Sequence, residues 1–242
     1  MENSLWTFGC SFTGEYAPLK CDPPNSYDLY SEFKGGNLPK VWAKLLSEKL
    51  NLKYENKGKG ATSNASIFYS FCDNCKNFEK NDIVIVQWTS IYRFLFANPN
   101  NNHLQDMLPS EEYFEFKNDK KHLEYIFVNR TNDCYIQEII SYVKIIMELC
   151  KEKKVKLFFW TYNDTEYIPY IETIFSDFKK QQWITDYSFN TLPGLMIKLS
   201  IDSKDKHTIL NETNNQINDS HLGELGHKAQ AEYFYNYIKK QI

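Results

Sequence analysis

The stretch Ile83–Trp88, Ile-Val-Ile-Val-Gln-Trp, constrains the fold of this chain most strongly. It is rich in β-branched residues and apolar almost throughout, without the alternation of a half-exposed strand. Such a run is typical of a strand that is buried on both faces. We therefore expect it to be the central strand of a parallel sheet with helices on both sides.

Helix-like and strand-like segments alternate along the rest of the chain. We expect further strands from Leu5, at 52–56, at 154–160 and, shorter, at 183–184, and helices at 38–50, 65–77, 135–152, 168–180 and 229–238. This alternation predicts an α/β fold, a three-layer α/β/α sandwich around a mostly parallel, flavodoxin-like sheet. We expect one domain over residues 1–242, with a loop at 12–36 and a lid or recognition insertion at about 94–132.

Composition excludes several classes of function. The net charge is −3, and no basic run is long enough to follow a phosphate backbone, so we expect no nucleic-acid partner. No run of 18 apolar residues and no leader peptide are visible, so we expect no membrane partner and a cytoplasmic protein. Among the six cysteines only Cys72 and Cys75 are close in sequence. No second ligand pair follows them, so we expect neither a metal nor another cofactor.

The first strand runs into Gly9-Cys10-Ser11. Ligands of open α/β sheets bind at the carboxyl ends of the strands, which is where Ser11 would lie. Ser11 is therefore a candidate nucleophile. An ordinary strand-end turn is the alternative interpretation.

Near the other end of the chain, Asp219-Ser220-His221 precedes the last predicted helix. A histidine on such a loop can reach a strand-end serine, while a carboxylate fixes its tautomer and stabilises the imidazolium ion. The alternative is that Asp219 or Ser220 caps the helix and that His221 lies in its first turn.

Together these segments resemble the blocks of the SGNH hydrolases, also called the GDSL esterase and lipase family. Gly9-Cys10-Ser11 is similar to the first block, Gly58 and Gly60 to the second, 87–90 to the third, and Asp219 with His221 to the last. The order and spacing agree from about residue 5 to residue 238.

The resemblance implies ester hydrolysis through an acyl-serine. Ser11 would be the nucleophile, His221 the general base and Asp219 its orienting acid. The backbone N–H groups of Ser11 and Gly60 would form the oxyanion hole with a third donor.

Three positions depart from the family pattern. Thr89 stands in place of the third-block asparagine, and Asn64 is the other candidate for that donor. Asn218 occupies the position three residues before His221, where many members have the acid, so either Asn218 or Asp219 would orient the histidine. Cys10 replaces the first-block aspartate.

The residues near these blocks favour a sugar substrate. Trp88, Tyr92 and Arg93 offer stacking and hydrogen bonding, which suggests a carbohydrate O-acetyl esterase acting on a small-molecule or glycan ester. Arg93 would contact an anionic group of the substrate or pair with a loop carboxylate.

Three alternatives remain open at this point. One is an inactive glycan-binding protein with the same fold, and another is a lipase or other acyl-ester hydrolase with a non-sugar substrate. The third is a flavodoxin-like nucleotide-binding domain in which Gly58 and Gly60 approach phosphate. The sequence does not predict an oligomeric state.

Overall fold

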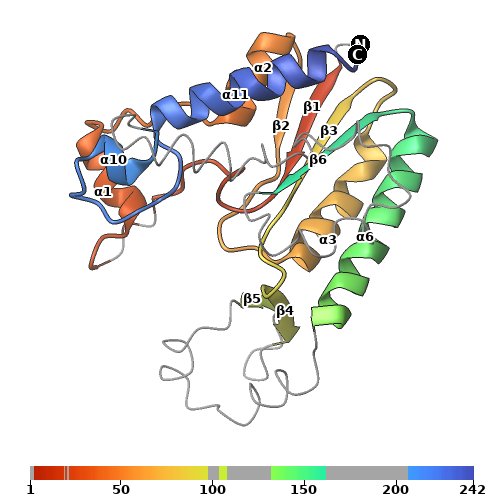
Figure 1. The fold of residues 1–242 in the computed structure, drawn as a ribbon, viewed down its shortest axis with the longest axis horizontal. Coiled ribbons are helices and arrows are strands. Elements are labelled where there is room, and N and C mark those ends of the chain that lie inside the picture. Colours follow the sequence, from red (N-terminus) through yellow and green to blue (C-terminus); the bar gives the residue numbers. More distant parts are fainter. Residues whose placement is uncertain (1–2, 19, 21, 98–103, 108–131, 162–206) are drawn as a thin grey trace.

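A computed structural model describes residues 3–18, 20, 22–97, 104–107, 132–161 and 207–242, and in these ranges four parallel strands form the central sheet (Figure 1). The strands are β1 (Ser4–Phe8), β2 (Lys53–Asn56), β3 (Ile83–Trp88) and β6 (Lys156–Thr161). Their order is β2-β1-β3-β6, so β3 pairs with β1 on one side and with β6 on the other. The predicted central strand and the mostly parallel sheet are confirmed.

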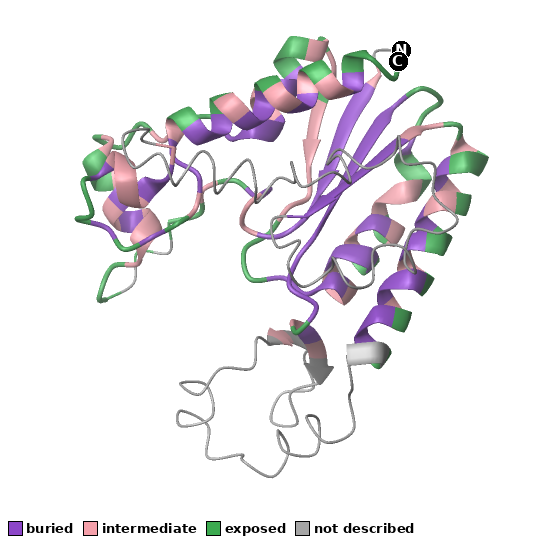
Figure 2. Cartoon of the chain, viewed as in Figure 1, coloured by how far each residue is buried: buried purple, intermediate pink, exposed green. Residues whose placement is uncertain are grey.

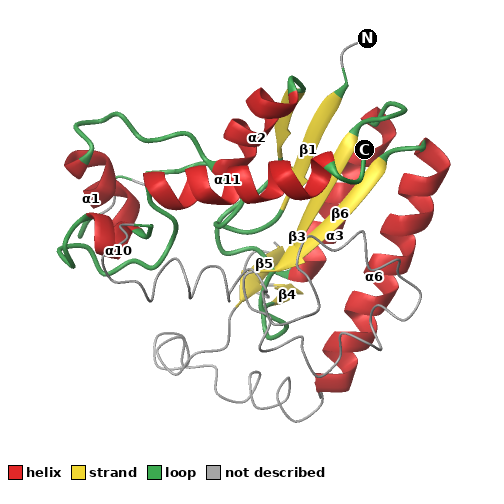
Figure 3. Cartoon of the chain, turned by 45° about the horizontal axis from the view of Figure 1, so that its top comes forward, coloured by secondary structure: helices red, strands yellow, loops and turns green. Residues whose placement is uncertain are grey.

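Helices cover both faces of this sheet (Figures 1 and 3). On one face lie α2 (Trp42–Leu50) and α11 (Glu224–Lys239), and on the other lie α3 (Asn64–Asn74), followed by the short η1 (Cys75–Asn77), and α6 (Asn132–Lys153). The three-layer α/β/α arrangement is therefore confirmed.

Alternate residues of the central strands point into two separate cores. Trp6 and Val84 pack with α3 and α6, whereas Leu5 and Ile85 pack with α2 and α11. Both β1 and β3 are buried along their whole length (Figure 2). Burial of both faces explains why the sequence of β3 shows no alternation.

A buried carboxylate aligns β1 with β3. Asp82 accepts hydrogen bonds from the backbone N–H of Ser4 at 2.7 Å and from the indole N–H of Trp6 at 2.9 Å. It thereby joins the starts of the two strands, where Leu5 pairs with Ile83. This alignment also brings the carboxyl ends of β1 and β3 to the same edge of the sheet.

The segment predicted as a loop at 12–36 contains a helix, α1 (Ser26–Phe33). A capping box begins it, because the Asn25 side chain accepts from the backbone N–H of Asp28 and the Asp28 carboxylate accepts from that of Asn25. The prediction overlooked this signal. The segment nonetheless lies beside a candidate site residue, because Tyr27 on α1 packs edge-on to His221.

Two predicted helices have different starts in the structure. α2 begins at Trp42 instead of residue 38, and its first N–H donates to the buried imidazole Nδ1 of His227 at 3.1 Å. α11 begins at Glu224 instead of residue 229. A Cβ at Gly226 would lie 2.1 Å from the carbonyl oxygen of His207, so close packing requires this glycine.

The expected insertion at 94–132 begins with an antiparallel hairpin of β4 (Phe94–Ala97) and β5 (Leu104–Met107). The Asp106 carboxylate on β5 accepts from the Ser63 N–H at 2.8 Å and from the Ser66 hydroxyl at 2.7 Å, at the start of α3. The hairpin is therefore anchored beside the carboxyl edge of the sheet.

Some expected elements lie outside the described residues. These are most of the insertion, the helix at 168–180 and the strand at 183–184. Among the helices that the structure does describe, none combines the length and apolar character needed to cross a bilayer.

Candidate active site

Ser11 lies in a tight turn directly after β1. The N–H groups of Thr13 and Gly14 both donate to the carbonyl oxygen of Cys10 at 2.9 Å, which closes the turn around the serine. The chain reaches this point at the carboxyl edge of a parallel sheet, where such folds bind ligands.

Gln87, the one polar residue within β3, holds this turn in place. Its completely buried side chain accepts from the Cys10 N–H at 3.2 Å and from the Thr13 hydroxyl at 2.6 Å, and its amide lies 3.0 Å from the Cys10 sulfur. Sequence reasoning overlooked this role. The available signal was an amide side chain inside an otherwise apolar strand.

Glycines allow three segments to meet at this turn. A Cβ at Gly9 would lie 2.5 Å from Oε1 of Gln87, and a Cβ at Gly58 would lie 2.6 Å from the backbone nitrogen of Gly14. Asn56 ties the same loop to the turn, since its amide donates to the Thr13 carbonyl at 2.8 Å. Close backbone packing thus accounts for Gly58 without a phosphate ligand.

The structure brings Ser11, His221 and Asp219 together. The Oγ atom of Ser11 lies 2.7 Å from Nε2 of His221, and Nδ1 of His221 lies 2.6 Å from Oδ1 of Asp219. Asn218 is exposed, and it is Asp219 that contacts the histidine. The helix-capping interpretation is wrong, because α11 begins only at Glu224, with Gly223 as its N-cap.

The hydrogen bonds determine the tautomer of His221. An ionised carboxylate only accepts hydrogen bonds, so Nδ1 carries the proton toward Asp219 and Nε2 presents a lone pair to Ser11. Burial alone would raise the pKa of Asp219. The hydrogen bonds and charge of His221, together with the Ser26 hydroxyl, outweigh burial and hold this pKa below its usual value.

Helix α1 supplies two neighbours of the triad. The Ser26 hydroxyl donates to Oδ2 of Asp219, the oxygen that His221 does not use. The Tyr27 ring lies edge-on to the imidazole with 5.5 Å between centroids, while Phe12 stacks on it at 4.6 Å. The imidazole is therefore held between aromatic rings. The capping signal that reveals α1 could have directed attention to these residues.

Backbone contacts fix the loop that carries His221. The carbonyl of His221 accepts from the N–H of Ile209 at 2.9 Å, next to a β-bridge between Thr208 and Leu222. Tyr16 donates its hydroxyl to the carbonyl of Leu222 at 2.8 Å.

Glu212 lies at the end of α10 (Ile209–Glu212), and its hydrogen bonds stabilise the same loop. Its carboxylate accepts from the Tyr30 hydroxyl at 2.7 Å, the Lys34 ammonium at 2.9 Å and the N–H of Glu224 at 3.0 Å. The start of α11 is thus joined to α1, and the histidine loop lies between them.

Two backbone groups can serve as an oxyanion hole. A Cβ built at Gly60 would lie 3.9 Å from the Cβ of Ser11, so the second glycine loop passes directly beside the serine. The N–H groups of Ser11 and Gly60 donate to no acceptor in the described part of the chain. Both are therefore available to a ligand.

The two side chains expected as the third donor are buried around the turn that follows β3. Thr89 is completely buried, and its hydroxyl accepts from the Arg93 guanidinium at 3.3 Å. Asn64 accepts from the Thr89 N–H at 2.9 Å, and its amide faces the Thr89 carbonyl at 3.3 Å. Both side chains hold the turn that follows β3.

The expected substrate-binding residues have different environments. Trp88 is completely buried and stacks on Phe159, so its proposed contact with substrate is wrong: as the last residue of β3 it belongs to the core. Tyr92 is 38% exposed, and Arg93 lines a pocket.

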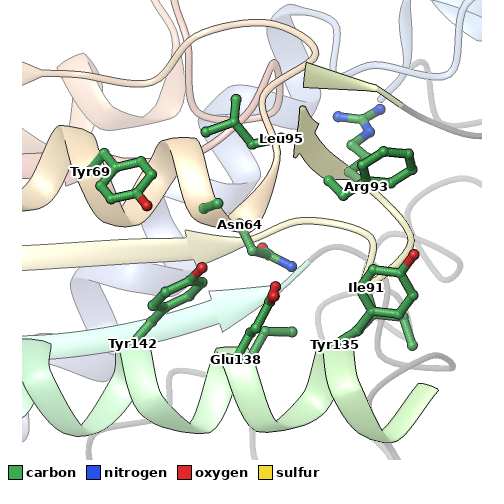
Figure 4. A pocket seen from close by; sticks show the side chains of 11 residues that line it. Asn64, Tyr69, Ile91, Arg93, Leu95, Tyr135, Glu138 and Tyr142 are labelled. Atoms are coloured by element: carbon green, nitrogen blue, oxygen red, sulfur yellow. The ribbon is translucent and has the colours of Figure 1, made fainter. Parts of the chain in front are cut away.

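This pocket has a volume of about 250 Å³ and lies between α3, α6 and β4. Figure 4 shows Glu138 extending from α6 toward Asn64 on α3, with Tyr142 on one side of it and Tyr135 on the other. The lining combines aromatic and polar side chains with the aliphatic Ile91, Leu95 and Ile139.

Metal ligation has no support in the described ranges, where no three His, Cys, Asp or Glu side chains are grouped to hold an ion. Cys72 and Cys75 are free thiols at the end of α3 and in η1, and Cys75 donates to the carbonyl of Cys72 at 3.1 Å.

No protein-family model and no curated protein sequence matches this chain. Solved structures with a similar fold include protein YxiM from Bacillus subtilis, with 13% identity and a TM-score of 0.47, and the acetyl xylan esterase Est2A from the rumen bacterium Butyrivibrio proteoclasticus, with 11% identity and a TM-score of 0.41. These alignments cover 100% and 99% of this chain, which spans 57% and 64% of the length of the two neighbours.

Proposed function

We propose that this chain is a serine esterase of the SGNH type, which removes O-acetyl groups from a carbohydrate through an acyl-serine intermediate. The observation that carries the proposal is the continuous contact from Ser11 Oγ through the His221 imidazole to the Asp219 carboxylate. Such a relay activates a serine hydroxyl, which is a weak nucleophile at its ordinary pKa.

Acylation follows from this geometry. Nε2 of His221 takes the proton of Ser11 as Oγ bonds to the acyl carbon, and the carbonyl electrons move to the oxyanion. The N–H groups of Ser11 and Gly60 donate to that oxygen. When the intermediate collapses, the bond to the alcohol oxygen breaks, and that oxygen takes the proton from Nε2.

Deacylation repeats the sequence with water. His221 takes a proton from the water, whose oxygen attacks the acyl carbon, and returns that proton to Oγ of Ser11. Free enzyme and acetic acid result, and the acid releases its remaining proton to solvent as acetate forms. Asp219 stays ionised throughout and stabilises the imidazolium form of His221.

The surroundings of the site support a sugar as the alcohol part of the substrate. The pocket between α3, α6 and β4 is lined by Arg93, Glu138 and three tyrosines among other residues, and Tyr92 is exposed next to Arg93. Aromatic rings with hydrogen-bonding groups between them suit hydroxylated rings. An acetyl group is small enough to need no apolar channel.

The burial of Thr89 and Asn64 favours one second candidate, a glycan-binding protein with weak or no hydrolytic activity. Removing one oxyanion donor typically costs about 10²- to 10³-fold in rate. This candidate predicts sugar binding without release of acetate.

The test is acetate release from 4-nitrophenyl acetate and from an acetylated methyl glycoside. We expect the wild type to hydrolyse both and Ser11→Ala to lose about 10⁴-fold or more. Ser220→Ala, which alters an exposed serine beside the triad, is the matched control and should retain activity. Binding of the glycoside without turnover would support the glycan-binding candidate. A preference for long acyl chains would contradict the sugar substrate.

A further inference from the structure

Phe12 directly follows the candidate nucleophile, and its ring lies against a face of the candidate base. The ring centroids of Phe12 and His221 are 4.6 Å apart and the two planes are inclined by 27°, so the rings are stacked. Tyr27 approaches the same imidazole at 5.5 Å with an angle of 66° between the planes. Of these two rings, only that of Phe12 is parallel enough to stack on the imidazole.

Contacts with the protein core hold Phe12 in this position. Its carbonyl accepts a hydrogen bond from the indole N–H of Trp42 at 2.7 Å, and Trp42 is completely buried. The side chain of Phe12 also packs against the core between the sheet and the helices α2 and α11. The backbone and the ring are thus both anchored, which keeps the ring on the imidazole.

The charge of His221 changes during the proposed reaction. In each step Nε2 takes a proton, from Ser11 or from water, and the neutral imidazole becomes an imidazolium cation. Asp219 contacts this cation at its edge, through Nδ1, whereas Phe12 contacts it at a face. The face of a phenyl ring carries partial negative charge and attracts a cation that lies within about 6 Å of its centroid. The 4.6 Å stack is inside that range.

We propose that Phe12 is a positioning residue whose ring face stabilises the imidazolium form of His221. The proposal rests on the esterase function above. The proton that Nε2 takes from Oγ passes to the alcohol oxygen in acylation, and the proton taken from water returns to Oγ in deacylation. Phe12 exchanges neither protons nor electrons. Its attraction is stronger for the cation than for the neutral imidazole, so it lowers the barrier of both steps.

This role requires a ring with a negative face, and an apolar side chain of similar size does not suffice. The decisive variant therefore carries pentafluorophenylalanine at position 12. Its ring is apolar and nearly as large as that of phenylalanine, but the fluorine atoms withdraw electrons and reverse the sign of the charge on the face. Because the size is kept, the midpoint of urea denaturation should match that of the wild type.

The measured quantity is kcat/KM for 4-nitrophenyl acetate and for the acetylated methyl glycoside. The contact is partly buried, so we expect the fluorinated ring to lower kcat/KM about 5- to 30-fold. Both esters should be affected, because acylation forms the imidazolium with each of them. Phe12→Leu, which removes the ring, should lose about as much. Phe12→Tyr, which keeps a negative face, should stay within about twofold of the wild type.

Pentafluorophenylalanine at position 33 is the matched control. Phe33 is 47% exposed on α1 and stacks on Tyr30, so this variant should retain the kcat/KM of the wild type. Wild-type kcat/KM with the fluorinated ring at position 12 would overturn the proposal while the esterase function stands. If the wild type hydrolyses neither ester, the esterase function fails and this inference fails with it.

Discussion

Ser26 and Asp219 are 193 positions apart in the sequence, yet the hydroxyl of one donates to the carboxylate of the other. The bond occupies the carboxylate oxygen that His221 leaves unused. It joins the start of α1 to the candidate triad, and it is one of the contacts that hold the pKa of Asp219 down.

Ser26→Ala should therefore weaken the orientation of Asp219 without removing it. We expect kcat/KM for an acetate ester to fall roughly tenfold, because hydrogen bonds to charged groups contribute about 1.5–3 kcal/mol. The pKa of Asp219 should rise toward its ordinary value, because one of the contacts that lower it is lost. Ser31→Ala, on the same helix, is the control. An unchanged kcat/KM would show that Ser26 does not act on the carboxylate.

Gly9→Ala should distort the serine turn. The new methyl group would lie 2.5 Å from Oε1 and 2.7 Å from Cβ of Gln87, which is itself fixed by the Cys10 N–H. We expect a loss of stability of about 1–3 kcal/mol in chemical denaturation, together with a loss of esterase activity. Gly60→Ala is the comparison variant. Among the residues that the structure describes, its new Cβ would meet only Ser11, at 3.9 Å, so its stability should be close to that of the wild type. Equal stabilities for the two variants would contradict the tight packing at Gly9.

The buried imidazole at the start of α2 should make stability depend on pH. Burial lowers the pKa of His227 from 6.5 to about 3, so between these values the unfolded chain binds a proton that the folded chain does not. The free energy of unfolding should then fall as the pH drops below about 6.5, with a slope approaching 1.4 kcal/mol per pH unit.

Urea denaturation of the wild type and His227→Asn between pH 7 and pH 5 tests this slope. Asparagine keeps an acceptor for the Trp42 N–H but does not titrate. Its stability should change less over this range. This pH range lies well above the pH at which Glu224, whose pKa is lowered to about 2, becomes protonated and loses its ion pairs. Parallel curves for the two proteins would contradict the effect of His227.

Local sequence signals were sufficient for the sheet and for the three triad residues. The apolar run of β3 predicts a strand buried on both faces, and the parallel arrangement alone brings Ser11 to the edge where ligands bind. Asp219 and His221 are only two residues apart on the same short loop, so their proximity follows directly from the sequence.

The supporting residues depend on long-range contacts that no local pattern contains. Gln87 meets Cys10 only once β1 and β3 pair, and Tyr27 meets His221 only once α1 docks at the sheet edge. For Trp88 the sequence-based prediction was wrong in the other direction, because a core residue was assigned to a binding surface. An aromatic residue at a strand end suggested a binding surface, but the α3 and α6 layer buries it.

The most direct test of the proposed triad is labelling with a fluorophosphonate probe, followed by mass spectrometry of the peptide that contains Ser11. The wild type should be labelled at Ser11, Ser11→Ala should not be labelled, and Asp219→Asn should react slower by roughly 10³-fold or more. Folded wild-type protein that is not labelled at Ser11, or is labelled at another serine, would contradict the account.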